Sequence, residues 1–421
     1  MTLNLNITRQ GAYSTGTLNL YVWVVDFEAT GTGWVQASTW SSSSSPAAPT
    51  LALATPGTST TATQTFALTG RDANGFTDIQ RMYFLVNSSA GLSVLQRINT
   101  AVFQRPELVM HNLHQLSQHM QRKLQQGHPA LGSRRWEHPQ LICTHQGDQT
   151  WHCCEAGGFW RSLSFIPQAD TVDVIAGVQQ ARELGSGLGL FHTLISDLPV
   201  DTLADPLEGF HITPHYLEAY HRALASTDHP SGEAERFCMA FIHGREALVP
   251  LLEDAKHRGD LPLRPIHGDP KINNVMLDRS SGKAVALIDL DTVKPGLVHY
   301  DIGDCLRSCC NPLGEETTDL SGVVFDLPLA EAILEGYLTE AGSLLTAQEV
   351  ALLPDAARLI SFELGLRFFT DHLNGNVYFK ARHPEHNLQR ALVQFRLTAS
   401  IEAQMAPLRS LVQRLAACSS P

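Results

Sequence analysis

Basic residues are scarce in this chain relative to acidic ones. Its 421 residues include 30 Lys and Arg against 42 Asp and Glu, which gives a formal net charge of −12 at pH 7. Binding to nucleic-acid phosphates or to anionic lipids requires a basic face. We therefore expect neither a nucleic-acid nor a membrane partner, and the sequence contains no indication of the oligomeric state.

Long apolar runs and a regular cysteine spacing are also missing. No stretch approaches the roughly 18 consecutive apolar residues of a membrane span, and residues 1–10 lack the cationic and apolar regions of a secretory signal. The eight cysteines have no repeated spacing that would indicate a disulfide framework. We therefore expect a cytoplasmic protein with reduced thiols.

The composition is otherwise that of a folded protein. Hydrophobic residues make up 43% of the chain and charged residues 17%, which leaves enough apolar material for a sizeable core. A chain of this length usually divides into more than one compact unit. We therefore expect at least two globular parts.

The first 88 residues differ in composition from the rest. Two strand-like runs of β-branched and aromatic residues, 18–25 and 82–86, flank a stretch rich in Ser, Pro and Thr. We predict a β-rich fragment over residues 1–40, a flexible linker over 41–65 and a second strand fragment over 66–88. The two fragments resemble parts of bacterial immunoglobulin-like β-sandwich modules.

A different pattern begins near residue 89. A strand is predicted over 94–99, and apolar residues at helical spacing predict a helix over 106–126 that begins at a proline. Further helices are predicted over 172–184, 214–223, 233–256, 330–341, 347–369 and 388–417. The predicted fold class is α+β, with a small β-rich lobe over 89–168, a large helical lobe over 169–421 and the extra β-rich segment at the N-terminus.

A short polar loop after an apolar run carries the clearest chemical signal. It contains the sequence His267-Gly268-Asp269, and Asn274 follows five residues after the aspartate. This spacing is that of a kinase catalytic loop, in which the aspartate accepts the proton of the attacking hydroxyl and the asparagine binds a metal ion. Lys271 provides a cation suited to the transferred phosphate. We therefore predict that Asp269 and Lys271 are catalytic.

A second carboxylate follows the next predicted strand. Residues 285–288 form an apolar run, and Asp289 comes directly after it. An aspartate in this place can hold a metal ion against the phosphates of a nucleotide, as the Asp of Asp-Phe-Gly does in protein kinases. Asp289 and Asn274 are therefore the predicted metal ligands.

Several motifs support a family resemblance over about three quarters of the chain. They are Leu95-Gln96-Arg97-Ile98-Asn99, Phe159-Trp160-Arg161, Phe210-His211-x-Thr213-Pro214, the loop around Asp269, Asp289-Leu290-Asp291-Thr292-Val293-x-Pro295-Gly296, Asp301-x-Gly303-Asp304-x-x-Arg307 and Arg367-Phe368-x-Thr370-Asp371-x-Leu373-x-Gly375-x-x-Tyr378-Phe379. From Leu95 onward the chain resembles the aminoglycoside phosphotransferase and choline kinase-like family, and within it N-acetylhexosamine 1-kinases. The resemblance implies a two-lobed protein-kinase-like fold, ATP with magnesium (Mg2+), and phosphate transfer to the anomeric hydroxyl of an N-acetylated hexose.

The resemblance also implies roles for further residues. Asp291 would be an auxiliary carboxylate at the metal, next to Asn274 and Asp289. The substrate would contact Arg367, Tyr378, Phe379 and Arg307, and the nucleotide would contact Arg97 and Phe165. Arginine donates hydrogen bonds to hydroxyl or acetamido oxygens, and aromatic faces pack on the C–H side of a pyranose.

One element of that family is altered or absent in this sequence. Family members carry a glycine-containing loop between two strands before the strand at Leu95, and residues 74–79 and 83–86 occupy its place here. Backbone N–H groups of such a loop surround the phosphates and exclude water. The leading hypothesis is an active sugar kinase. The alternatives are a non-catalytic or impaired nucleotide- or sugar-binding homologue, a kinase for choline or an aminoglycoside, and an adhesion module, which would require export.

Overall fold

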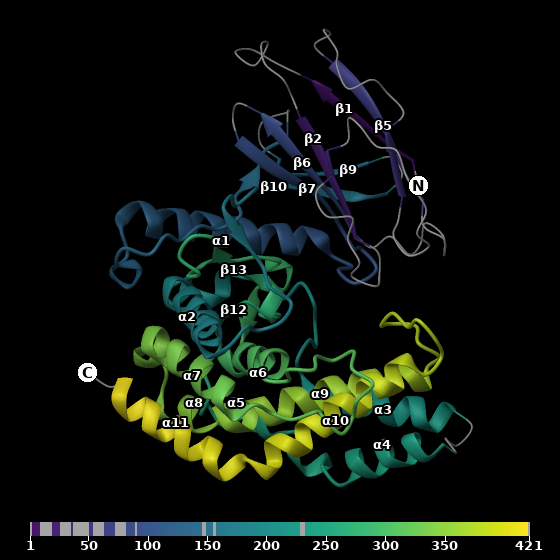
Figure 1. The fold of residues 1–421 in the computed structure, drawn as a ribbon, viewed down its shortest axis with the longest axis vertical. Coiled ribbons are helices and arrows are strands. Elements are labelled where there is room, and N and C mark those ends of the chain that lie inside the picture. Colours follow the sequence, from purple (N-terminus) through teal and green to yellow (C-terminus); the bar gives the residue numbers. More distant parts are fainter. Residues whose placement is uncertain are drawn as a thin grey trace. The chain divides into compact units, whose positions relative to one another are not determined.

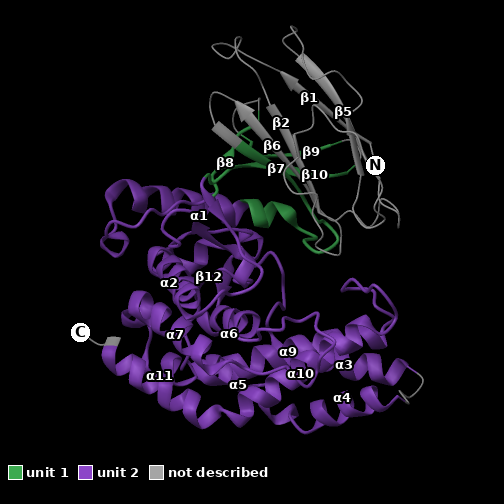
Figure 2. Ribbon diagram, viewed as in Figure 1, with its two compact units in different colours: residues 1–110, 139–167 green, residues 111–138, 168–421 purple. Residues whose placement is uncertain are grey.

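The computed structural model describes most of the chain in two compact units. Unit 1 comprises residues 1–110 and 139–167, and unit 2 comprises residues 111–138 and 168–421 (Figure 2). Figure 1 labels the helices and strands. The described residues are 2–8, 19–25, 35–36, 50–53, 63–71, 81–88, 91–144, 149–154, 157–227 and 232–419.

The described residues of unit 1 form two antiparallel sheets. The smaller has the strand order β1-β5-β4, and the larger has the order β3-β2-β6-β7-β10-β8 with β9 paired to β10. The strands of the smaller sheet are β1 (Thr2–Thr8), β5 (Thr63–Arg71) and β4 (Thr50–Leu53). Those of the larger are β3 (Val35–Gln36), β2 (Asn19–Val25), β6 (Arg81–Ser88), β7 (Gly91–Ile98), β10 (Phe159–Ser164), β8 (Leu141–Ile142) and β9 (Trp151–Cys153).

The larger sheet joins strands that the sequence assigns to different parts. β6 lies in the predicted fragment 66–88, and β7 lies in the predicted lobe 89–168. The two strands pair antiparallel, with Ser88 opposite Gly91 and Phe84 opposite Leu95. Residues from both predicted parts therefore share one hydrogen-bonded sheet.

The predicted flexible linker, 41–65, includes strand residues. β4 lies within it and β5 begins in it, and the two strands pair with each other. β5 also pairs with the distant strand β1, which supplies backbone hydrogen bonds that the local content of Ser, Pro and Thr does not indicate. The remaining residues of the linker, and residues 74–79 in the place of the glycine-containing loop, lie outside the described residues.

Unit 2 is mainly helical, which confirms the predicted α+β class with a β-containing lobe and a larger helical part. Its helices are α1 (Pro106–Gln126, which begins in unit 1), α2 (Val178–Ile195), α3 (Thr213–Ser226), α4 (Glu233–His243), α5 (Leu251–His257), α6 (Val298–Cys309), α7 (Leu327–Ala341), α8 (Ala347–Ala351), α9 (Leu353–Leu373), α10 (His386–Ala403) and α11 (Met405–Ser419). Two small sheets complete it, with the orders β11-β13-β14 and β12-β15. Their strands are β11 (Ala169–Asp170), β13 (Val275–Asp278), β14 (Ala284–Leu287), β12 (Arg264–Ile266) and β15 (Lys294–Gly296).

Glycines allow α2 and α7 to pack with their backbones in close approach. A Cβ atom on Gly185 would overlap the carbonyl oxygen of Ile333, and one on Gly336 would overlap that of Arg182. The predicted helix 172–184 ends just before Gly185, and a glycine in a helix interior costs about 1 kcal/mol relative to alanine. In the structure α2 begins later and continues to Ile195, and the tertiary packing outweighs this cost.

Replacing Gly185 with Ala should therefore destabilise the protein, although alanine is the better helix former. The added methyl group must displace the backbone of α7, and we expect a loss of about 2–3 kcal/mol in the free energy of unfolding. Urea unfolding of the full chain measures this loss. The exposed Gln179 on the same helix provides the control, since Gln179→Ala should change stability by less than about 0.5 kcal/mol. A Gly185→Ala variant as stable as the parent would contradict the close approach.

Candidate active site

The loop that contains Asp269 lies between two strands of unit 2. It follows β12 and leads into β13, which pairs antiparallel with β14. The ladder extends past the strand ends, because the Ile288 N–H donates to the Asn274 carbonyl at 2.9 Å. Asn274 and Asp289 therefore lie at adjacent ends of neighbouring strands, although 15 positions separate them in the sequence.

The predicted base, cation and amide are in direct contact. Lys271 Nζ donates to Asp269 Oδ2 at 2.8 Å, and Asn274 Nδ2 donates to the Asp269 carbonyl at 2.7 Å. The Asp269 side chain is 28% exposed, so its carboxylate is accessible to a substrate hydroxyl. The loop therefore brings together three of the residues predicted from the sequence.

A buried carboxylate from α6 holds the start of this loop. Asp301 Oδ2 accepts from the His267 N–H and Oδ1 accepts from the Gly268 N–H, each at 2.7 Å. His192 Nε2 donates to the same carboxylate at 2.8 Å, and Tyr337 donates its hydroxyl proton to His192 Nδ1. Asp301 is fully buried. The sequence motif that contains Asp301 indicates no role for it, and the structure shows that it orients the backbone before Asp269.

Gly268 is required at its position for two reasons. Its φ angle of 90° lies in a region that side chains rarely adopt, and a Cβ atom there would lie 2.5 Å from the Thr292 carbonyl oxygen. The Thr292 hydroxyl donates to the His267 carbonyl at 2.8 Å. His267 Nε2 donates to the Ile288 carbonyl at 3.0 Å, so this ring also supports the backbone. The loop that contains Asp269 is thus linked by hydrogen bonds to the segment that carries Asp289.

Asp289 has an uncommon backbone conformation. Its φ and ψ angles are 61° and 50°, in the left-handed region, and the short helical turn Leu290–Thr292 follows it. Non-glycine residues in this region are uncommon and cluster at functional sites. The turn keeps Asp291 in the same segment, two residues after Asp289, and both side chains are half-buried.

The predicted metal ligands fit magnesium better than a transition metal. Among residues 91–144, 149–154, 157–227 and 232–419, no three His, Cys, Asp or Glu side chains converge on a potential metal position. The predicted set consists of the Asn274 amide oxygen and the Asp289 carboxylate, with Asp291 as an auxiliary carboxylate. Hard oxygen donors that are few in number suit magnesium, which keeps several waters and takes further ligands from substrate phosphates.

A cluster of aromatic rings surrounds the predicted substrate-binding arginine. The Arg367 guanidinium carbon lies 4.8 Å from the Tyr216 ring centroid and 5.2 Å from those of Phe210 and Phe379. Desolvation lowers the pKa of Arg367, but Tyr216, Glu363 and a hydrogen bond with Tyr378 raise it overall. We call these residues, Phe210, Tyr216, Arg367, Tyr378 and Phe379, the arginine cluster.

Two members of the arginine cluster were missed in the sequence. Phe210 belongs to a motif quoted above, but no role was assigned to it, and Tyr216 lies one turn into α3. Their distance from Arg367 in the sequence exceeds 150 positions. A local pattern cannot indicate that such distant residues meet.

One buried carboxylate organises the loop that follows α9. Asp371 Oδ1 accepts from the N–H groups of Val377 and Tyr378 at 2.9 and 2.7 Å, and Oδ2 accepts from that of Phe379 at 2.8 Å. Charged hydrogen bonds of this kind are stronger than neutral ones. Asp371 therefore fixes the backbone from which Tyr378 and Phe379 project.

Arg307 makes a different set of contacts from Arg367. Its guanidinium donates to Asp304 at 2.8 Å and to Glu315 at 3.3 Å, and only 7% of the residue is exposed. Desolvation opposes its charge, but Asp304 and Glu315, with a smaller effect of Asp269, raise the pKa of Arg307 overall. Arg307 thus lies within electrostatic range of the predicted base, and its role in substrate binding stays a prediction.

The two residues predicted to bind the nucleotide belong to unit 1. Arg97 is exposed on β7, opposite Trp160 of β10. Phe165 follows β10 directly and is half-buried. Their contact with a nucleotide stays a prediction.

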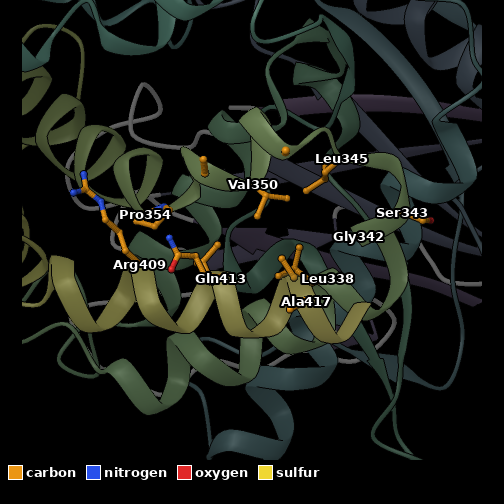
Figure 3. A pocket seen from close by; sticks show the side chains of 13 residues that line it. Leu338, Gly342, Ser343, Leu345, Val350, Pro354, Arg409, Gln413 and Ala417 are labelled. Atoms are coloured by element: carbon orange, nitrogen blue, oxygen red, sulfur yellow. The ribbon is translucent and has the colours of Figure 1, made fainter. Parts of the chain in front are cut away.

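A groove of about 620 Å³ lies elsewhere on unit 2 (Figure 3). α11 lines it with Arg409, Gln413 and Ala417, and Leu338 and Val350 lie across from them. None of the residues predicted to act on a substrate lines this groove. Within the described part of the chain, no helix is both long and apolar enough to span a bilayer.

Comparison with known proteins identifies the family. The chain matches the phosphotransferase enzyme family, abbreviated APH, over residues 79–351. This stretch contains the loop around Asp269, the segment with Asp289 and Asp291, and Arg307. It also includes β6, which the sequence grouped with the β-sandwich fragment.

Solved structures show the same fold. A microcompartment-associated aminopropanol kinase has 15% sequence identity and a TM-score of 0.51, over 78% of this chain and 90% of that one. An aminoglycoside phosphotransferase from Alicyclobacillus acidocaldarius subsp. acidocaldarius has 16% identity and a TM-score of 0.51, over 79% and 90%.

These similarities confirm the predicted kinase-like fold. The predicted closeness to N-acetylhexosamine 1-kinases and the immunoglobulin-like resemblance stay predictions. The family match extends over more than half of the chain and includes the loop that carries Asp269, Lys271 and Asn274. This chain therefore belongs to the phosphotransferase enzyme family.

Proposed function

We propose that the protein transfers the γ-phosphate of ATP, with magnesium, to a sugar hydroxyl, and specifically to the anomeric hydroxyl of an N-acetylhexosamine. The observation that supports phosphate transfer is the contact of Lys271 and Asn274 with Asp269, next to the strand end that carries Asp289. Phosphoryl transfer depends mainly on position and charge, and these residues supply both.

Each residue of the loop has a defined task in this proposal. Asp269 accepts the proton of the attacking hydroxyl, and Lys271 orients its carboxylate while facing the transferred phosphate. Asn274 and Asp289, with Asp291 as an auxiliary carboxylate, would hold magnesium, which neutralises charge on the β- and γ-phosphates when bound. Asp301 keeps the loop backbone in place during the reaction.

The arginine cluster supports a neutral acceptor. Arginine keeps its positive charge at all relevant pH values, so Arg367 repels cations such as choline or an aminoglycoside. The guanidinium already lies over one face each of the Phe210, Tyr216 and Phe379 rings, where it would compete with a quaternary ammonium group. A pyranose can pack its C–H face on such rings and accept a hydrogen bond from Arg367 through an acetamido oxygen.

A panel of acceptors tests the proposal. The full chain is incubated with ATP, magnesium and one of N-acetylglucosamine, N-acetylgalactosamine, glucose, choline or an aminoglycoside, and the phosphorylated product is measured. We expect the largest kcat/KM for an acetylated hexosamine. A larger value for choline or the aminoglycoside would contradict the acceptor, and nucleotide binding without any turnover would favour the non-catalytic alternative.

Arg367→Lys should weaken acceptor binding selectively. Lysine keeps the charge but loses the planar fork of donors, so we expect KM for the acetylated sugar to rise about tenfold or more while KM for ATP stays unchanged. Steady-state kinetics with each substrate varied separately measures both constants. Arg396 provides a matched control, because it also stacks on a ring, that of Phe237, outside the arginine cluster. Equal effects on both KM values would argue against a sugar contact.

A further inference from the structure

His211 connects the catalytic loop to α9. This histidine lies just before α3 and is 4% exposed. Its Nε2 bonds to the Gly268 carbonyl oxygen at 2.9 Å, and its Nδ1 bonds to Glu363 Oε1 at 3.0 Å. Gly268 precedes Asp269, and Glu363 lies one turn before Arg367 on α9. One imidazole ring therefore bridges the base-bearing loop and the helix that carries the arginine cluster.

The bonding partners can accommodate a proton on both ring nitrogens. A carbonyl oxygen can only accept, so Nε2 must donate to Gly268. The Thr213 hydroxyl donates to Glu363 Oε2 at 2.7 Å, which leaves Oε1 of Glu363 to accept from Nδ1. These contacts fit an imidazolium ion paired with a buried carboxylate.

Other charged and titratable groups around the ring have opposing effects. Desolvation and the nearby Arg367 lower the pKa of His211, whereas Glu363 and Asp304 raise it, and the overall shift is upward. The Tyr300 ring of α6 stacks on the imidazole with 5.4 Å between centroids, and the Tyr216 side chain bonds to the His211 backbone. The contacts of the ring and the surrounding charges thus both favour the doubly protonated form of His211.

The backbone at His211 is held in an uncommon conformation. Its φ angle is 66°, in the left-handed region that costs a non-glycine residue about 1 kcal/mol or more. Lys294 Nζ donates to the carbonyl oxygens of Leu207 and Phe210 at 3.3 and 3.2 Å, which fixes the preceding segment. Because surrounding contacts maintain the strained conformation, the position of the ring is closely determined.

We propose that His211, as an imidazolium ion bound to Glu363, is a positioning residue that sets the distance between the Asp269 loop and the arginine cluster. It bonds to no group with an assigned chemical step and acts through the Gly268 carbonyl. Its effect on turnover rests on the proposed function, but its protonation state and its coupling to Gly268 do not.

The protonation state gives the positioning a definite dependence on pH. A histidine whose pKa is raised in the folded protein is fully protonated below its ordinary value of 6.5 and loses the proton as pH rises through the raised value. Loss of the proton removes one of its two bonds. We therefore expect kcat to fall on the alkaline side.

Kinetics of three variants test the role in turnover. His211→Asn should lower kcat about 10- to 100-fold with KM for ATP nearly unchanged, and it should remove the alkaline decline. Glu363→Gln should shift that decline to lower pH by about one unit or more, since the ring loses its counter-charge.

The control is His138→Asn. His138 is also buried and bonds to Ser117, and desolvation lowers its pKa to about 4. A purely structural role would lower the melting temperature of His211→Asn but leave kcat per folded molecule and the pH profile unchanged.

A second measurement needs no acceptor. In the full chain labelled with 15N-histidine, comparison with His211→Asn assigns the His211 resonances, and both ring nitrogens should be protonated at pH 7. In a 15N-glycine sample, the Gly268 amide should titrate together with His211, whereas that of Gly282 should not. A singly protonated His211 at pH 7, or a Gly268 resonance insensitive to His211, would overturn the proposal. If no acetylated hexosamine is phosphorylated in the acceptor panel, but His211 is doubly protonated and the Gly268 amide titrates with it, only the proposed acceptor is contradicted.

Discussion

Replacing Asp269 with Asn should lower kcat by about 10³- to 10⁴-fold while nucleotide binding is retained. The amide has nearly the shape of the carboxylate but cannot accept the proton of the attacking hydroxyl. It also loses the ionic contact with Lys271, which lies 2.8 Å from Oδ2 in the parent. Product formation with the best acceptor of the panel measures kcat, and ATP binding is followed separately by calorimetry.

Asp173→Asn is the control for this experiment. Asp173 is an exposed aspartate of the same unit, outside the helices and strands, and its amide variant should keep the parental kcat. If Asp269→Asn retained more than about a tenth of the parental turnover, proton transfer to this carboxylate would not limit the reaction. The assignment of Asp269 as the base would then be wrong.

Asp301→Asn should reduce both stability and turnover. Two backbone N–H groups and His192 donate to the carboxylate, and an amide offers one accepting oxygen where the parent has two. A buried donor would face the NH2 group of the amide without a partner, at a cost of about 3 kcal/mol or more in the free energy of unfolding. Because these donors belong to His267 and Gly268, the base should also be displaced. Urea unfolding and kcat of the folded fraction measure the two effects.

Asp355→Asn separates the two effects of Asp301→Asn. Asp355 is also buried, at the start of α9, and pairs with Arg358 and Arg409 rather than with the catalytic loop. We expect its variant to lose stability but to keep its turnover per folded molecule. A similar loss of stability with unchanged kcat in Asp301→Asn would mean that Asp301 has no part in orienting the loop.

The sequence was sufficient for the part of the site that is local in the chain. Asp269, Lys271 and Asn274 lie within six residues, so their spacing was sufficient to predict that these three residues meet. Asp301, His211 and Glu363 could not be assigned roles in this way. Their partners are distant in the sequence, and only tertiary packing brings a buried carboxylate or imidazole to the loop.

The predicted helices show a similar limit. The predicted bounds 106–126 of α1 agree with the structure because its apolar spacing is regular and a proline marks its start. The region 233–256 is divided into α4 and α5, with Gly244 and Pro250 in the break, where apolar residues continue. The same happens in 347–369 and 388–417, where breaks near Leu352 and Gln404 separate two helices each. Apolar spacing indicates which residues are helical but not where the axis changes direction.

The shared sheet of unit 1 bears on how the protein can be shortened. The composition of the first 88 residues suggests an appendage that could be removed without effect on the remainder. However, β6 pairs along β7 from Ser88 to Phe84, so a chain that began after Ser88 would leave one side of β7 without its hydrogen-bonding neighbour. An uncovered strand edge is a template for association with other chains. Truncation at this apparent boundary would therefore favour aggregation of the very lobe that it was meant to isolate.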